Sequence, residues 1–382
     1  MSDCVERLTA GEVLALCVLG LLVVGVLAVE SAAQDVGAAA AVDALRLSGS
    51  GAKHALLAGL AVIVFWAGSR LPARWVGQGW VGPAAVLVAA AALVAVLVPG
   101  VGLSVNGARR WLPLPGGVVL QASELGKWAA VAWLAWRCPR PGALSDLRGF
   151  VVTGLPVAGI CLLVVIEDFG TAALIAVAAL AVLLAAGAKL WHLLLAAGPA
   201  AGAGYLFVAG TPYRWGRMTS FLDPWADPEG KGFHMIQSLL SFAGGGPTGR
   251  GLGLGVQKLG YLPEDTTDFV FATWCEETGI FGAAVVVGLY LGVLAACWRA
   301  VRRAGDPHVR LLALSVGVVV GLQATINLAV ATVSVPTKGM SLPLISAGGS
   351  GLLLTALMLG LLASTLSPTA AATAATTPEA DA

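Results

Sequence analysis

The sequence contains few charged residues for its length. Only 11% of its 382 residues are Asp, Glu, Lys or Arg, whereas 58% are hydrophobic and the mean hydropathy is +0.87. Soluble domains carry roughly 25% charged residues, so this chain has too few polar side chains to cover a soluble globule of its size. The net charge of +1 also gives no basic surface for nucleic acid. These scarcities exclude a soluble enzyme, a disordered scaffold and a nucleic-acid binder.

Cysteine and histidine are also few and scattered. None of the six cysteines forms a Cys-x-x-Cys pair, and the four histidines are far apart in the chain. The sequence therefore predicts neither a disulfide framework nor a metal site built from His and Cys. The cysteines are better explained as small buried apolar residues.

Long apolar runs are what the sequence does contain, and each has the length of a helix that crosses a bilayer. About ten such spans are predicted, near residues 11–29, 54–69, 82–101, 118–137, 149–166, 170–188, 191–209, 270–298, 310–334 and 349–366. The predicted fold is all-α: a polytopic membrane protein whose transmembrane domain covers residues 1–366. One large extracytoplasmic loop is expected at about 210–268. The low-complexity tail 367–382 is expected to be disordered and cytoplasmic.

The short loops between the spans differ in charge. Arginine and lysine gather in alternate loops, at residues 70–74, 137–148, 189 and 299–310. Because the positive loops of membrane proteins lie in the cytoplasm, both termini are predicted to be cytoplasmic. The loops 102–117, 210–268 and 335–348 then lie on the other side. They hold most of the unusual polar residues, so any chemistry is expected there.

The first outer segment carries charge into a predicted span. Arg109 and Arg110 precede this span, and Glu124 and Lys127 lie three residues apart within it, on one helix face. Ionisable groups inside a membrane are costly and mark functional sites by default. Two plainer explanations stay open. Glu124 and Lys127 could form a structural ion pair, and the arginines could bind lipid head groups.

The other two outer segments contain broken backbone and isolated charges. The glycine run at 244–255 is not a P-loop, because no Gly-Lys-Ser/Thr follows it, and no βαβ unit surrounds it. Asp268 stands where the long loop re-enters the membrane, and by itself it is most simply a helix N-cap. The segment 336–350 is broken by proline and glycine and contains Lys338. Such a backbone is tolerated at membrane depth only inside protein or beside a cavity.

Together these segments resemble the SEDS family (shape, elongation, division and sporulation), with its FtsW, RodA and SpoVE branches. The resemblance covers nearly the whole chain from about residue 100, and the stretches 217–225 and 258–263 lean towards the FtsW or sporulation branch. The matching motifs are Asn106-Gly-Ala-Arg-Arg-Trp111, Ser123-Glu124 with Lys127, Asp168-Phe-Gly-Thr171, Tyr261-Leu-Pro-Glu264, Thr267-Asp-Phe269, Glu276-Glu277, Pro336-Thr-Lys-Gly339, Leu342-Pro343 and Gly348-Gly-Ser350.

The resemblance implies a ten-helix fold and a peptidoglycan glycosyltransferase. Such an enzyme polymerises lipid II into glycan strands at the outer face of the bacterial cytoplasmic (inner) membrane, in cell division or cell-shape maintenance. Its implied partner is a class B penicillin-binding protein, a transpeptidase that crosslinks the strands. Asp268 falls on the family's essential acidic position, which changes its preferred explanation from helix cap to catalytic residue.

Some positions depart from the family's pattern. Ala122 stands where the family usually has proline, and Ala347 where it usually has tyrosine; both are expected to be packing changes. Gly260 stands where many relatives carry an acidic residue. Without that carboxylate, we expect either that Glu264 or Asp265 compensates or that the site is slower.

The resemblance and the polar residues together predict a mechanism. Asp268 is the expected general base for the attacking sugar hydroxyl, and basic groups would stabilise the departing diphosphate. No cofactor is assigned, although a divalent cation on the diphosphate stays an open alternative that no ligand cluster demands. The predicted substrate-binding residues are Arg109, Arg110, Glu124, Lys127, Arg250, Lys258 and Lys338.

Two functions of other classes stay open. A flippase for lipid-linked precursors would use the same substrate, but it would need a polar path through the cytoplasmic half as well. That half offers mainly loop arginines, which topology alone explains. A non-catalytic scaffold for the penicillin-binding protein would have no need of Asp268 and the basic residues.

Overall fold

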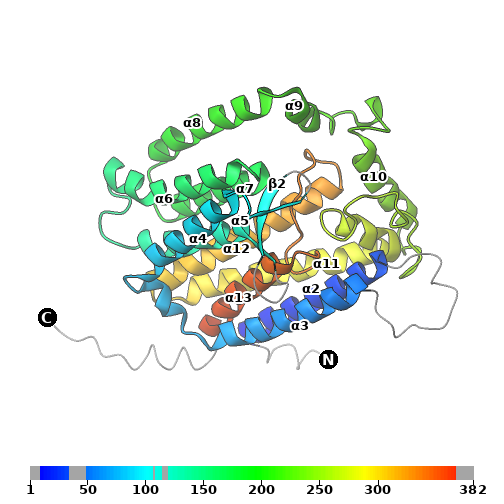
Figure 1. Cartoon of the computed structure of the whole chain (residues 1–382). Helices are drawn as coiled ribbons and strands as arrows, with labels where there is room; N and C mark the ends of the chain where they lie inside the picture. Colours follow the sequence, from blue (N-terminus) through cyan, green and yellow to red (C-terminus); the bar gives the residue numbers. More distant parts are fainter. Residues whose placement is uncertain (1–8, 34–48, 106–107, 114–118, 367–382) are drawn as a thin grey trace.

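The computed structural model describes residues 9–33, 49–105, 108–113 and 119–366, so the predicted tail and Asn106 lie outside the described residues. Long helices form a bundle (Figure 1). They are α2 (Ala10–Ala32), α3 (Gly49–Arg70), α4 (Val81–Leu97), α5 (Ala122–Arg137), α6 (Leu147–Val165), α7 (Phe169–Ala185), α8 (Leu190–Ala209), α11 (Val270–Arg303), α12 (Pro307–Ala331) and α13 (Gly349–Leu366).

These described helices lie at the positions of the predicted spans. By length and composition, seven helices in the described ranges can cross a membrane: α2, α3, α6, α8, α11, α12 and α13. The helices α4 and α7 are apolar but shorter. The predicted all-α polytopic fold is therefore confirmed, while the number of membrane crossings stays a prediction.

Buried apolar side chains form two adjoining cores. One core joins α2, α3, α11, α12 and α13, and the other joins α4, α5, α6 and α7. Helix α12 connects them, because it packs against α5 and α7 as well as against α11. Helix α8 lies apart at the upper edge (Figure 1), and only His192, Leu193 and Val208 of this helix are buried.

The second and the last helix of the described bundle, α3 and α13, pack closely because glycine lines their contact. A Cβ added at Gly360 would lie 2.2 Å from the carbonyl oxygen of Phe65, and one added at Gly68 would lie 2.8 Å from that of Leu357. Small residues let helix backbones approach in a membrane, where close packing replaces the hydrophobic effect as the force that joins helices.

Shorter elements form the predicted outer side. An antiparallel sheet in the order β1-β2-β3 consists of Leu103–Val105, Ala108–Pro113 and Val119–Gln121. The predicted span 118–137 is thus wrong at its start, because its first residues pair with β2 and α5 begins only at Ala122. The loop 210–268 contains α9 (Pro212–Thr219), the 3-10 helix η3 (Pro224–Ala226) and α10 (Phe233–Gly245).

Helix α11 is interrupted near its outer end. Gly279 has φ +66, a left-handed conformation that glycine adopts without strain. A Cβ there would lie 2.5 Å from the backbone nitrogen of Gly249, so the space is also closed. The residues before this break, from Val270 to Glu277, are all buried. The N-terminal end of α11 is therefore a short, enclosed segment, and Asp268 lies two residues before it.

We expect Gly360→Ala to destabilise the bundle by about 1–3 kcal/mol, because the added methyl group meets the α3 backbone. Thermal unfolding of the purified protein in detergent measures this. Gly59→Ala in α3 is the control, since a Cβ there meets nothing within 4 Å. An equal drop in melting temperature for both variants would contradict the packing explanation.

Candidate active site

Asp268 lies between the long outer loop and α11. Helix α11 begins at Val270 with Phe269 in the N-cap position and no side-chain cap, so Asp268 is not the N-cap of this helix. Its backbone is fixed from α12, because the Asn327 amide donates to the carbonyl oxygens of Asp268 at 2.9 Å and of Met340 at 2.8 Å. The carboxylate is free for another role, and its main-chain position is defined.

The loop between α12 and α13 lies against this carboxylate. A Cβ added at Gly339 would lie 3.0 Å from Oδ2 of Asp268. Glycine at this position therefore leaves room beside the acid. Lys338 precedes this glycine, and its Nζ lies 4.3 Å from the centre of the Phe169 ring. Residues from α7, from this loop and from the start of α11 thus meet at one place.

Asp168 forms the third corner of the site. It caps α7, since its Oδ1 accepts from the Thr171 amide at 3.0 Å and its Oδ2 accepts from the Thr171 hydroxyl at 2.8 Å. The same Oδ2 lies 3.4 Å from Nη1 of Arg110 on β2. The Nε of Arg110 is buried and has no partner among the described residues. This guanidinium therefore keeps one donor available for a bound group.

Burial and the surrounding charges change the pKa of Asp268. Burial raises the pKa of Asp268 to about 7, and the negative charges of Glu264 and Asp168 act in the same direction. The positive charges of Arg110 and Arg217 oppose this rise. A carboxylate with a pKa near 7 can both accept and release a proton at neutral pH, which suits a general base.

The pKa of Lys338 is shifted in the opposite direction and comes close to that of Asp268. Burial lowers the pKa of Lys338 to about 8, and the neighbouring charge of Arg217 adds to this effect, whereas Asp168 opposes it. An acid and a cation with such close pKa values in one place are typical of a functional site.

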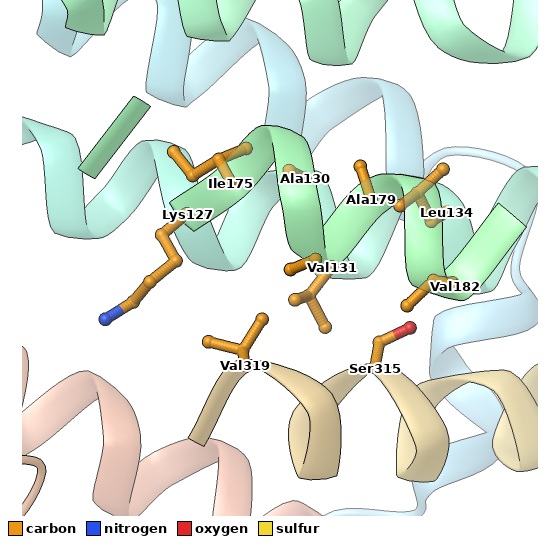
Figure 2. A pocket seen from close by; sticks show the side chains of 10 residues that line it. Lys127, Ala130, Val131, Leu134, Ile175, Ala179, Val182, Ser315 and Val319 are labelled. Carbon is orange, nitrogen blue, oxygen red and sulfur yellow. The ribbon is translucent and has the colours of Figure 1, made fainter. Parts of the chain in front are cut away.

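Glu124 and Lys127 lie deeper in the bundle. Lys127 is 1% exposed, and its Nζ donates to Glu124 Oε2 and to Gln323 Oε1 on α12, both at 2.7 Å. The predicted shared helix face is confirmed. Figure 2 shows Lys127 at one end of a small cavity between α5, α7 and α12, with Ser315 towards the other end. Apart from these two residues, the cavity is lined by alanine, valine, leucine and isoleucine.

The other three predicted substrate contacts have different surroundings. Arg109 is exposed, and its backbone amide donates to Glu167 Oε2 at 2.7 Å. Arg250 lies 3.4 Å from Glu276 Oε1, and Lys258 lies 2.9 Å from Glu277 Oε1. Both carboxylates are two helical turns beyond Asp268 on α11. The structure therefore places Arg110 on Asp168 and Lys338 beside Phe169, in the elements around Asp268, whereas Arg250 and Lys258 pair with Glu276 and Glu277.

The sequence carries a family signal along nearly its whole length. The FtsW/RodA/SpoVE family, described as "Cell cycle protein", matches residues 10–369. The chain belongs to this family. The resemblance inferred from the sequence motifs is thereby confirmed.

Curated relatives in the FtsW/RodA/SpoVE family include two similar to this chain over most of its length. The "Probable peptidoglycan glycosyltransferase FtsW" of Alkalilimnicola ehrlichii is 40% identical, and the alignment covers 91% of this chain and 87% of the relative. The protein of the same name from Thioalkalivibrio sulfidiphilus is 46% identical, with 71% of this chain and 69% of the relative covered.

Two solved structures have a similar fold. One is described as "Structural coordination of polymerization and crosslinking by a peptidoglycan synthase complex", with a TM-score of 0.73 and 26% identity over 92% of this chain and 96% of that chain. The other is the rod shape determining protein RodA of Thermus thermophilus, with a TM-score of 0.66 and 24% identity over 92% and 94%. The bundle is thus the fold of this family.

Two charged residues near Asp268 were not assigned to the site from the sequence: Asp168 was noted only within a family motif, and Arg217 only within a quoted stretch. Glu264 was named, with Asp265, as a replacement for the carboxylate that is missing at Gly260. Glu264 precedes Asp268 by four residues in a turn, where its carbonyl accepts from the Asp268 amide at 3.1 Å and its φ is +57, so no helical pattern marked their proximity. His234 on α10 was missed entirely; its ring stacks on that of Phe269 at 6.2 Å between centroids, and burial lowers its pKa.

The described residues contain no group of side chains that is preformed to hold a metal ion. In the described ranges, no group of three or more His, Cys, Asp or Glu side chains is arranged to hold an ion. The divalent cation considered from the sequence therefore stays a prediction.

We expect Glu264→Gln to lower the pKa of Asp268 below about 7, because a neighbouring negative charge is removed. The carboxyl titration can be followed by infrared difference spectroscopy, with Asp268→Asn identifying the band. Glu229→Gln, an exposed carboxylate of the same outer loop, is the control and should leave the titration unchanged. The electrostatic assignment fails if Glu264→Gln also leaves it unchanged.

Proposed function

We propose that this chain is a peptidoglycan glycosyltransferase that polymerises lipid II into glycan strands, in cell division or cell-shape maintenance. The observation that carries the proposal is a carboxylate with a pKa of about 7 that lies against the loop of Lys338 and Gly339, with the charge of Arg110 acting on it. Lipid II needs both: a base for its sugar hydroxyl and cations for its diphosphate. The names of the FtsW relatives support the same reaction.

The reaction takes place at the outer face of the bacterial cytoplasmic membrane. The positive loops at 70–74, 137–148 and 299–310 lie in the cytoplasm, as do both termini. Asp268, the sheet and the loop between α12 and α13 then lie on the outer side. A lipid-anchored donor presents its sugar at this level, so no flipping is needed within the reaction.

Asp268 is the general base. It removes the proton from the acceptor's sugar hydroxyl as this oxygen attacks the anomeric carbon of the donor. The bond from that carbon to the diphosphate oxygen breaks, and the diphosphate departs with the electron pair. A single displacement converts the α-linked donor into a β-linked strand, so the site needs a base and no covalent nucleophile.

Arg110 and Lys338 stabilise the leaving diphosphate. Both are part-buried and interact with the charge of Asp168, and Arg110 has a buried Nε without a partner among the described residues. Cations aimed at a developing negative charge in a water-poor site contribute strongly to catalysis. Arg109 is exposed next to them and is suited to the first contact with the diphosphate or with lipid head groups.

Glu124 and Lys127 form the inner boundary of the site, on the side of the helix bundle. Their buried pair reaches α12 through Gln323 and lies below the outer loops. The small cavity beyond Lys127 is lined mostly by apolar side chains, an environment that disfavours passage of a charged head group. This observation favours the polymerase over a flippase.

A class B penicillin-binding protein is the partner that crosslinks the product. The fold similarity to a peptidoglycan synthase complex supports such an assembly. A divalent cation would add to the neutralisation of the diphosphate by Arg110 and Lys338, and removal of divalent ions with a chelator tests it.

The first test is lipid II polymerisation by the purified protein with its penicillin-binding partner. Asp268→Asn keeps the shape of the side chain but cannot accept the proton, so we expect a loss of at least about 100-fold in rate. Matched yield and partner pull-down serve as folding controls. Equal product from both forms would remove Asp268 from the mechanism, and no product from the wild-type complex would favour a flippase or a scaffold.

The pH profile of polymerisation should be a narrow bell. Asp268 must be ionised, so the rate rises up to about pH 7; Lys338 must be protonated, so the rate falls above about pH 8. Lys338→Arg should remove the alkaline limb, because arginine keeps its charge throughout this range. An unchanged alkaline limb in that variant would exclude Lys338 as its source.

A further inference from the structure

Two adjacent carboxylates of α11 are buried in a place that the proposed reaction does not use. Glu276 is 1% exposed and Glu277 is 2% exposed. Glu276 accepts hydrogen bonds from the backbone amides of Val256 and Gln257, each at 3.0 Å, and its Oε1 lies 3.4 Å from Nε of Arg250. All three of its partners belong to one segment, residues 246–258, which we call the glycine loop.

Glu277 also binds the glycine loop, through an ion pair with Lys258. Its Oε1 lies 2.9 Å from Nζ of Lys258, and both side chains are almost completely buried. The Ser31 hydroxyl at the end of α2 donates to Glu277 at 2.6 and 2.7 Å, and it accepts from Lys258 at 2.8 Å. Lys258 also donates to the Gly253 carbonyl at 2.9 Å. The first described helix, the glycine loop and α11 thus meet at one charged centre.

The backbone is joined at the same place. The break at Gly279 frees carbonyl groups of α11, and the amides of Arg250 and Gly251 donate to those of Glu276 at 3.0 Å and Glu277 at 2.9 Å. In return, the amide of Ile280 donates to the Pro247 carbonyl at 3.1 Å. The glycine loop therefore replaces part of the hydrogen bonding that α11 loses at its break.

We propose that Lys258 and Glu277 are positioning residues for Asp268, a role that rests on the function proposed above. Their ion pair closes the segment 258–277 into a ring, and Asp268 lies at the middle of this ring. One side of the ring contains Glu264, and the other side is the enclosed outer end of α11. Opening the ring releases both sides and lets the carboxylate move relative to Arg110 and Lys338.

The physical case rests on the cost of a single buried charge. A buried ion pair is often replaceable by a neutral pair, but removal of one partner leaves the other charge without compensation. The remaining charge of Lys258 or Glu277 would then recruit water into the site or displace the glycine loop. Because a displacement of about 1 Å can cost about 100-fold in rate, even a small shift of Asp268 is measurable.

The experiment compares Lys258→Met, Glu277→Gln and the double variant in lipid II polymerisation with the penicillin-binding partner. We expect each single variant to lose about 10- to 100-fold in kcat with KM changed by less than about 2-fold, since the diphosphate contacts remain. The acid limb of the pH profile should also shift, because Asp268 moves relative to Glu264, Asp168, Arg110 and Arg217. The double variant should recover most of the kcat.

Hydrogen exchange provides a readout that does not depend on activity. The amides of residues 250, 251 and 255–257 should exchange faster in each single variant and return towards the wild-type rate in the double variant. Asp146→Asn is the matched control, because this carboxylate also accepts a backbone amide bond, from Gly149 at the start of α6, but has no contact with the glycine loop. It should change neither the exchange of these amides nor the pH profile.

Ser31→Ala keeps the test decisive if a single-charge variant does not fold. This variant removes the hydroxyl between Lys258 and Glu277 and leaves both charges paired. We expect a smaller loss of kcat, about 3- to 10-fold, again with a displaced acid limb.

Three results would overturn the proposal. Folded single variants, or Ser31→Ala, could retain wild-type kcat and an unchanged acid limb. A double variant as defective as Lys258→Met would instead return Lys258 to the substrate contacts predicted from the sequence. Wild-type exchange at the glycine loop in the single variants would show that the ring does not open. Failure of the proposed function looks different: the wild-type complex makes no strands, or Asp268→Asn makes as many.

Discussion

The free-energy cost of burying a charged side chain among apolar helices determines how the acids of this structure are placed. The buried carboxylates Glu124, Asp168, Glu276 and Glu277 each lie within 3.4 Å of a cation, and each also anchors a separate part of the fold. Asp268 is different: in the described part of the chain, no hydrogen bond or ion pair is found for its carboxylate, although positive charges act on it from nearby. The paired acids hold parts of the fold together, whereas Asp268 has no such structural partner, which is why it is the residue proposed as the base.

The surroundings of Asp268 are assembled from several elements that are distant in sequence. Arg110 comes from a strand, Asp168 from a helix cap and Lys338 from a loop between the last two helices. Each of these groups is held by a local feature: a sheet pairing, a cap hydrogen bond or a cation over an aromatic ring. The backbone of Asp268 is fixed from α12, because the Asn327 amide donates both to its carbonyl oxygen and to that of Met340 in the loop before α13.

Much of the fold could be predicted because apolar runs and short-range spacing are local properties. The spans follow from hydropathy, and the Glu124–Lys127 contact follows from the helical repeat. The strand at Val119–Gln121 could not, because a pairing of three residues leaves no periodic signal beside a long apolar run. Lys258 was assigned to the substrate from the sequence without knowledge of its partners. These partners, Ser31 and Glu277, are identifiable only in the folded chain, since Ser31 precedes Lys258 by more than two hundred residues.

The glycine contact between α3 and α13 has a consequence for biogenesis. The ribosome delivers α3 to the membrane well before α13, so the Gly68 and Gly360 surfaces meet only after the described helices between them have been synthesised. Until then, the inner face of α3 is in contact with lipid or with the insertion machinery. The contact surface of α3 is therefore filled only when α13 arrives, and a chain truncated before α13 exposes this surface to membrane quality control.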